Sequence, residues 1–119
     1  MFFRVLVTGG RDYGDYARFE VAMEEIIRDA GDREIVIVQG GARGLDRIAH
    51  EWALAHEFPS ITVPARWSVE RNAAGAIRNQ RMLDQHGPFD LVVVFPGGNG
   101  TADMRRRAEA ANLIIRVVQ

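Results

Sequence analysis

The chain has 119 residues, of which 47% are hydrophobic and 26% are charged, and its formal net charge is −1. This length predicts a single domain over residues 1–119, with the composition of an ordinary globular protein. The absence of cysteine excludes disulfides and thiolate metal sites and fits a cytoplasmic location. No apolar run approaches the roughly 20 residues of a membrane span, so no membrane association is expected. The nearly neutral charge argues against a nucleic-acid partner.

The first half of the chain alternates apolar strands with amphipathic helices. Asp15 suits the N-cap of the first helix, and Gly31 suits its C-terminal end. An apolar stripe from Leu45 to Ala53 predicts a second helix. Strands are predicted at Phe2–Val7, Glu34–Gln39 and Ile61–Val63.

The second half begins with Ala65–Ala74, which has no clear period and is expected to be irregular. A short apolar run at Leu91–Phe95 is typical of a strand covered on both faces. The remaining expectations are helices over Gly75–Gln85 and Thr101–Ala111 and a last strand over Leu113–Val118.

This β-α alternation predicts an α/β fold, namely a Rossmann-like, doubly wound, parallel five-stranded sheet with helices on both faces. Right-handed crossovers favour the strand order 3-2-1-4-5. That order places strands one, two and four side by side. The glycine-rich loops at their carboxyl ends should then meet at one crevice, where ligands bind in such sheets.

Nine of the 12 glycines fall in these three loops, which cover 9–14, 40–44 and 96–101. Glycine lets backbone amides approach an oxyanion, and a helix N-terminus favours negative charge. Neither of the first two loops has the Gly-x-Gly-x-x-Gly spacing or a Walker A sequence, so an NAD fingerprint and a P-loop ATPase are disfavoured. The predicted phosphate-binding residues are Gly9, Gly10, Arg11, Gly40, Gly41, Arg43, Gly44, Arg78, Asn79, Pro96, Gly97, Gly98, Asn99, Gly100 and Thr101.

Several of these side chains have a second interpretation. Thr101 is either a phosphate donor or only a helix N-cap. Arg78 and Arg81 could form a solvated pair on the helix surface. Alternatively, Arg78 reaches over the rim formed by the glycine-rich loops. Arg43 either closes over an anion or is simply exposed. Asp46 is expected to stabilise the helix dipole rather than to act in catalysis.

All 15 basic residues are arginine, which is typical of a GC-rich genome and also supplies forks that fit phosphate. Trp67, in the irregular segment, either stacks on a base or anchors its loop. The histidines are scattered and do not form a metal-ligand pair, so neither a metal nor another cofactor is predicted.

The chain resembles the SLOG superfamily of Rossmann-like nucleotide-ligand domains, and within it the YspA-type family of bacterial and phage proteins. The resemblance spans nearly the whole chain. It rests on Val-Thr-Gly-Gly-Arg-Asp (7–12), Gly-Gly-Ala-Arg-Gly-Leu-Asp (40–46), Pro-Ala-Arg-Trp (64–67), Ala-Gly-Ala-Ile-Arg-Asn-Gln-Arg-Met (74–82) and Phe-Pro-Gly-Gly-Asn-Gly-Thr-Ala-Asp-Met (95–104).

The resemblance implies a small nucleotide-like ligand and a homodimer. The superfamily includes the lonely-guy phosphoribohydrolases, in which Pro-Gly-Gly-x-Gly-Thr-x-x-Glu supplies a catalytic Glu and a helix supplies a catalytic Arg. This chain keeps the Arg as Arg78 but has Met104 at the Glu position. Met can neither stabilise an oxocarbenium-like centre nor handle a proton.

Three functions are therefore compared. The first is a module that binds a nucleotide or a nucleotide derivative without turnover, as a sensor, sponge or regulator. The second is a nucleotide N-glycosidase, for which Arg78 and Asp103 are the weak catalytic candidates, with Asp12 or Glu70 as further carboxylates. The third is single-strand nucleic-acid binding, as in the DprA-type members of the superfamily, which the net charge disfavours.

Overall fold

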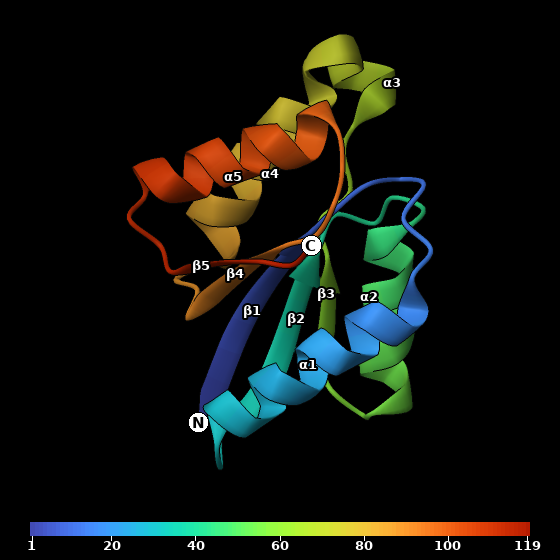
Figure 1. Ribbon diagram of the computed structural model, residues 1–119. Helices are drawn as coiled ribbons and strands as arrows, with labels where there is room; N and C mark the ends of the chain where they lie inside the picture. The colour runs from blue at the N-terminus through green and yellow to red at the C-terminus, as the bar shows by residue number, and fades with distance from the viewer.

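The protein contains one five-stranded sheet, in which all neighbouring strands are parallel and the order is β3-β2-β1-β4-β5 (Figure 1). The computed structural model describes all of residues 1–119. Its strands are β1 (Phe2–Thr8), β2 (Glu34–Gln39), β3 (Ser60–Thr62), β4 (Leu91–Val94) and β5 (Ile115–Val117). Its helices are α1 (Tyr16–Ala30), α2 (Leu45–Ala55), α3 (Trp67–Glu70), α4 (Ala74–His86) and α5 (Asn99–Ala110), with a 3-10 turn η1 (Arg71–Ala73). The predicted fold class and strand order are confirmed.

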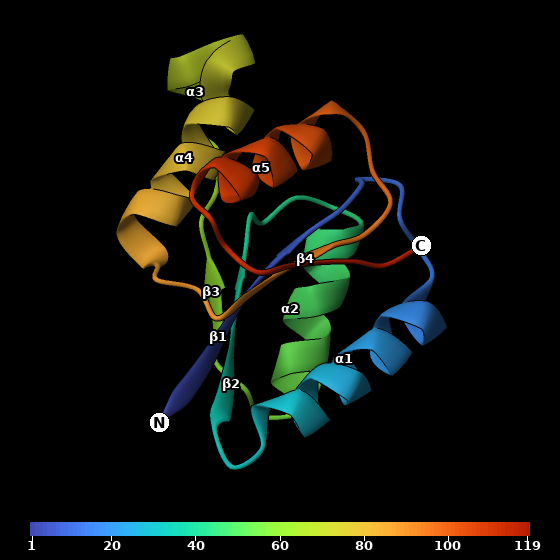
Figure 2. The same cartoon turned by 60° about the vertical axis from the view of Figure 1, so that its left-hand side comes forward.

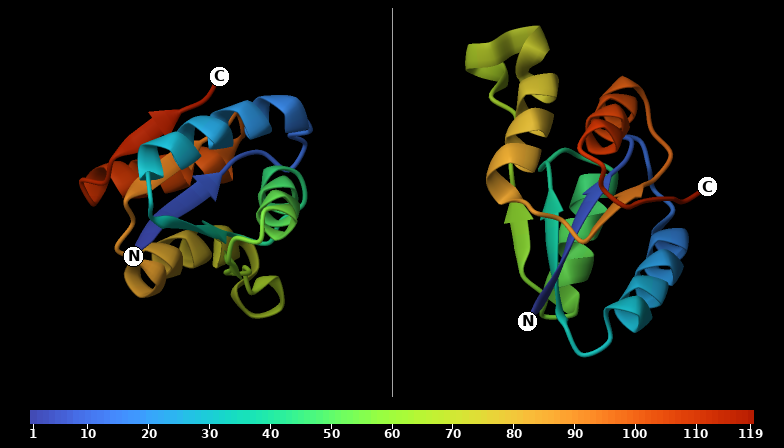
Figure 3. Two further views of the ribbon diagram at one scale, coloured as in Figure 1. Left: turned by 90° about the horizontal axis from the view of Figure 1, so that it is seen from below. Right: turned by 90° about the vertical axis from the view of Figure 1, so that its left-hand side faces the viewer.

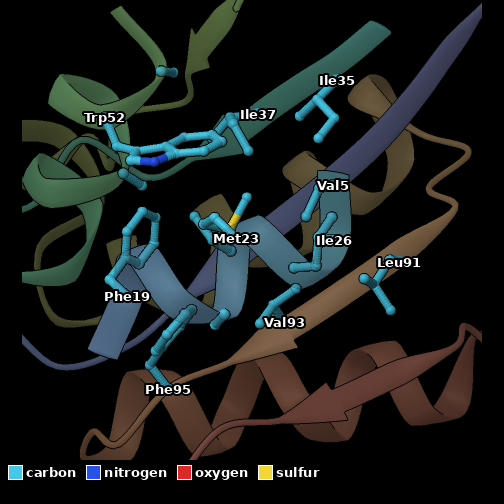
Figure 4. Close-up of a cluster of buried hydrophobic side chains, with 14 of the residues drawn as sticks. Val5, Phe19, Met23, Ile26, Ile35, Ile37, Trp52, Leu91, Val93 and Phe95 are labelled. Atoms are coloured by element: carbon cyan, nitrogen blue, oxygen red, sulfur yellow. The ribbon is translucent and has the colours of Figure 1, made fainter. Parts of the chain in front are cut away.

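Helices cover both faces of the sheet. On one face, Val5 and Val93 pack under α1 and α2 in a cluster that contains Phe19 and Trp52 (Figure 4). On the other face, Leu6 belongs to a second buried cluster formed with α4 and α5. The central strands therefore bury both faces, which explains their continuous apolar runs. None of the helices combines the length and the apolar character needed to span a membrane.

The ends of α1 follow the sequence signals. The Asp15 side chain accepts a hydrogen bond from the Arg18 amide at 3.0 Å, which satisfies one of the free donors at the helix start. Gly31 follows the last helical residue with φ at +63°, a left-handed conformation in which glycine avoids steric cost.

The expectation of an irregular segment at Ala65–Ala74 was wrong, because α3 and η1 form there. Neither of these short elements has a buried residue, so no apolar period marks them in the sequence. In Figure 2 and Figure 3, α3 projects from the end of α4, away from the sheet. The helix α5 begins two residues before the expected Thr101.

Candidate functional site

The three glycine-rich loops meet at the carboxyl ends of β1, β2 and β4. Gly10 joins them, because its amide donates to the Pro96 carbonyl at 2.9 Å and its carbonyl accepts from the Leu45 amide at 3.1 Å. The β1 loop is thereby bonded to the loop that follows β4 and to the start of α2. This convergence is what the predicted strand order required.

A cleft of about 1020 Å³ opens beside these loops. The β1 loop, the start of α4 and the start of α5 form most of its wall. Its lining includes Gly9, Gly10, Arg11, Tyr13, Ala42, Asp46, Trp67, Asn72, Arg78, Asn79, Pro96, Gly97, Gly98, Asn99, Gly100, Thr101, Asp103 and Arg106. Four predicted binding residues, namely Gly40, Gly41, Arg43 and Gly44, are not part of this lining.

The segment Gly97–Thr101 carries five consecutive backbone amides that donate to no acceptor in the protein. All five residues line the cleft, and the segment leads into the N-terminus of α5. The N-cap residue Gly98 has no side chain to satisfy these donors. Free amides at a helix N-terminus favour an anion.

Thr101 does not cap α5, contrary to one of its two interpretations. It is the third residue of the helix and is buried, and its hydroxyl packs against Gly97. The glycines of the loop after β2 predicted amides free to bind phosphate, but two amides of this loop already have acceptors in the protein. The Gly41 amide donates to Gln39 Oε1 at 2.6 Å, and the Ala42 amide donates to Asp46 Oδ2 at 3.2 Å. These two amides are therefore not free for a ligand.

Arg78 reaches over the rim of the cleft rather than into solvent. Its Nη1 atom donates to the Gly40 carbonyl at 2.6 Å, and its Nε atom donates to Asn79 Oδ1 at 3.0 Å. Burial lowers the pKa of the Arg78 guanidinium, and the nearby Asp46 carboxylate partly offsets that effect. Arg81 is also not a solvated residue, since its side chain is 13% exposed and donates to the Pro64 carbonyl.

Arg43 is exposed to solvent and does not close over the cleft, which agrees with the second of its two interpretations. Its side chain is 68% exposed and lies 3.4 Å from Asp12 Oδ1, outside the cleft. Arg11, in contrast, lines the cleft and forms no ion pair with a carboxylate. Its guanidinium lies over the Trp67 ring, 5.1 Å from the centroid. Trp67 therefore both contacts the β1 loop and presents an aromatic surface to the cleft.

Asn79 fixes α4 against the start of α5. It is buried, and its Nδ2 atom donates to the Gly100 carbonyl at 3.2 Å and to Asp103 Oδ2 at 3.0 Å. By holding Gly100, Asn79 orients the segment with the free amides.

Position 104, where the hydrolase pattern has Glu, faces the core and not the cleft. Met104 is 1% exposed and belongs to the cluster between the sheet, α4 and α5. The neighbouring Asp103 does line the cleft, but its Oδ2 atom also accepts from Arg107 Nε at 2.8 Å. The bonds from Arg107 and Asn79 hold the pKa of Asp103 below its usual value. A carboxylate held in this way is a poor proton donor.

Asp103 should make stability depend on pH. Because its pKa is lowered in the folded state, its contribution is present above the unfolded pKa, near 3.8, and is lost as the pH falls through the lower folded value. We expect Asp103→Asn to cost about 1 kcal/mol near neutral pH, a value reduced by solvent screening, and almost nothing in acid. Urea unfolding from pH 7 down to pH 2 measures this difference, with Asp32→Asn in an exposed turn as the control. An equal loss at every pH would contradict it.

Tyr13 lines the cleft but is not among the residues predicted from the sequence. Its ring packs edge-on against Phe95, with centroids 5.5 Å apart, and its buried hydroxyl has no hydrogen-bond partner. Burial raises the pKa of this phenol. An aromatic residue inside a glycine-rich loop was the available signal.

Comparison with known proteins identifies relatives of this chain. A family described as "YspA, cpYpsA-related SLOG family" matches residues 3–69, which run from β1 into α3. The chain belongs to this SLOG family. It is also 32% identical over 118 residues to the gene 61 protein of Mycobacterium phage D29, a match covering 92% of this chain and 91% of the phage protein. Membership of this family suggests a nucleotide-related function carried by a Rossmann-like fold.

Proposed function

We propose that the cleft binds a nucleotide or a nucleotide-derived phosphorylated ligand, with a phosphate on the amides of Gly97–Thr101. The observation that carries this proposal is the run of five amides without an acceptor at the start of α5. Such amides stabilise a phosphate through direct hydrogen bonds and through the helix dipole.

Four aspartates and three arginines line the cleft, so the proposal of an anionic ligand depends on which of these charges lack a partner in the protein. Two of its aspartates are already engaged, since Asp103 is bonded to Arg107 and Asp12 lies beside Arg43. Arg11 has no carboxylate partner, and the Nη2 atom of Arg78 makes no hydrogen bond. Two guanidinium groups are thus available beside the free amides, and the exposed face of Trp67 offers a surface for a base.

The geometry at and next to position 104 favours binding over hydrolysis. An N-glycosidase needs a carboxylate that can stabilise a developing cation or exchange a proton. Asp103 is the cleft carboxylate next to the hydrolase position, and it is committed to Arg107 and Asn79. We infer that the protein holds its ligand without turnover, as a sensor, sponge or regulatory module.

Thermal unfolding in the presence of nucleotides tests this proposal. A ligand at 100 times its Kd adds about 2.7 kcal/mol to the free energy of unfolding, which for this chain length raises Tm by about 10 °C. The compounds are nucleoside mono- and diphosphates, cyclic nucleotides and ADP-ribose, with the unphosphorylated nucleosides as controls. Native mass spectrometry of the purified protein searches for a retained ligand. If no phosphorylated compound raises Tm and none is retained, the proposal is wrong.

A further inference from the structure

Asp46 is a nearly buried carboxylate at the cleft that the phosphate site does not use. It lies in the first turn of α2 and is 7% exposed. Its carboxylate is held by the backbone of the loop after β2, including a hydrogen bond from the Ala42 amide to Oδ2 at 3.2 Å, while no side chain of the protein donates to Oδ1. Because Asp46 lines the cleft, a ligand group that donates to Oδ1 forms a hydrogen bond to a charged acceptor and gains affinity.

Gly40 allows Asp46 and Arg78 to face the cleft together. A methyl group at Gly40 would clash with the Arg78 guanidinium and would come within 3.0 Å of Asp46 Oδ2. Burial raises the pKa of Asp46, while the Ala42 amide and Arg78 oppose this effect. The negative charge of Asp46 disfavours a phosphate beside it. The partner that suits this position is a neutral hydrogen-bond donor.

The order of these groups along the sheet indicates which part of a nucleotide meets Asp46. The free amides follow β4, Asp46 follows β2, and Trp67 follows the edge strand β3. Since the strand order is β3-β2-β1-β4-β5, Asp46 lies between the strand that leads to the amides and the strand that leads to Trp67. A nucleotide has the same order of phosphate, ribose and base.

We propose that Asp46 accepts a hydrogen bond from a ribose hydroxyl of the ligand, so that the cleft selects ribonucleotides over deoxyribonucleotides. This inference rests on the proposed function, since it assumes that the phosphate lies at Gly97–Thr101. The selectivity arises because a deoxyribose leaves the carboxylate oxygen without a donor. A hydrogen bond to a charged acceptor corresponds to a preference of at least about 10-fold.

Isothermal titration calorimetry tests this selectivity with defined probes. The probes are the 5′-monophosphates of adenosine, guanosine, cytidine and uridine, each compared with its 2′-deoxy and 3′-deoxy forms. For the tightest ribonucleotide, we expect at least one deoxy form to bind about 10-fold more weakly. We expect Asp46→Ala to reduce this ratio to about 1. Asp32→Asn, in an exposed turn at the opposite end of β2, should leave it unchanged.

The outcomes separate this inference from the function on which it rests. If no phosphorylated compound binds, either here or in the thermal screen, and none is retained by the purified protein, the proposed function itself is wrong. If ribonucleotides and both deoxy forms bind the wild-type protein equally, the function stands and the inference is overturned. If Asp46→Ala disrupts folding, as judged by its thermal transition, Asp46→Asn replaces it and should reduce the ratio to below about 3. An undiminished ratio in a folded Asp46 variant would assign the selectivity to another residue.

Discussion

A Gly98→Val protein should fold like the wild type and bind its phosphorylated ligand at least about 100-fold more weakly. A Cβ atom at Gly98 would meet nothing within 4 Å, and φ is negative, at −102°, outside the left-handed region that favours glycine. The new side chain therefore costs little in folding. It would, however, occupy the space in front of the free amides. Losing two hydrogen bonds to a charged phosphate corresponds to about 3 kcal/mol, or about 100-fold in Kd.

The measurement compares ligand titrations and thermal unfolding of Gly98→Val with those of Ala102→Val. Ala102 is exposed in the same turn of α5 and does not line the cleft, so it receives the same isopropyl group without blocking the amides. The control should bind normally. If Gly98→Val is folded and also binds normally, the phosphate lies elsewhere.

The fold was predictable because its signals are local. Each apolar strand is predicted from its own residues, and the two ends of α1 are predicted from Asp15 and Gly31. The strand order then followed from the handedness of crossovers. The segment with α3 carried no such signal, since none of the residues of α3 is buried and no apolar period is needed there.

The candidate site was predictable only in part. A glycine-rich loop looks the same in the sequence whether its backbone amides are free or already hydrogen-bonded within the protein. The loop after β2 has as many glycines as the loop after β4. The difference is that the side chains of Gln39 and Asp46 accept hydrogen bonds from amides of the loop after β2. These contacts depend on side-chain positions in three dimensions. The core position of Met104 did have a signal, because Thr101, Met104 and Ala108 are spaced as one buried helix face.

Gly44→Ala should lower the free energy of unfolding by about 3 kcal/mol or more. Gly44 has φ at +77° and ψ at −126°, a conformation that other residues rarely adopt and that costs them roughly 1–3 kcal/mol. A methyl group there would also overlap the Gly10 carbonyl and lie 2.5 Å from the Arg11 carbonyl carbon. These atoms are backbone and cannot rotate away, so the β1 loop must move, which adds about 1–3 kcal/mol.

Two other glycines separate these causes in urea unfolding. Gly31 has φ at +63° but open space around it, so Gly31→Ala should show the conformational cost alone. Gly14 has open space and no positive φ, so Gly14→Ala should leave stability unchanged or raise it by about 0.5 kcal/mol. The expected order of destabilisation is Gly44→Ala, then Gly31→Ala, then Gly14→Ala. Equal losses of unfolding free energy for Gly44→Ala and Gly31→Ala would mean that the loops after β1 and β2 are not packed against each other. The described arrangement of these loops beside the cleft would then be wrong.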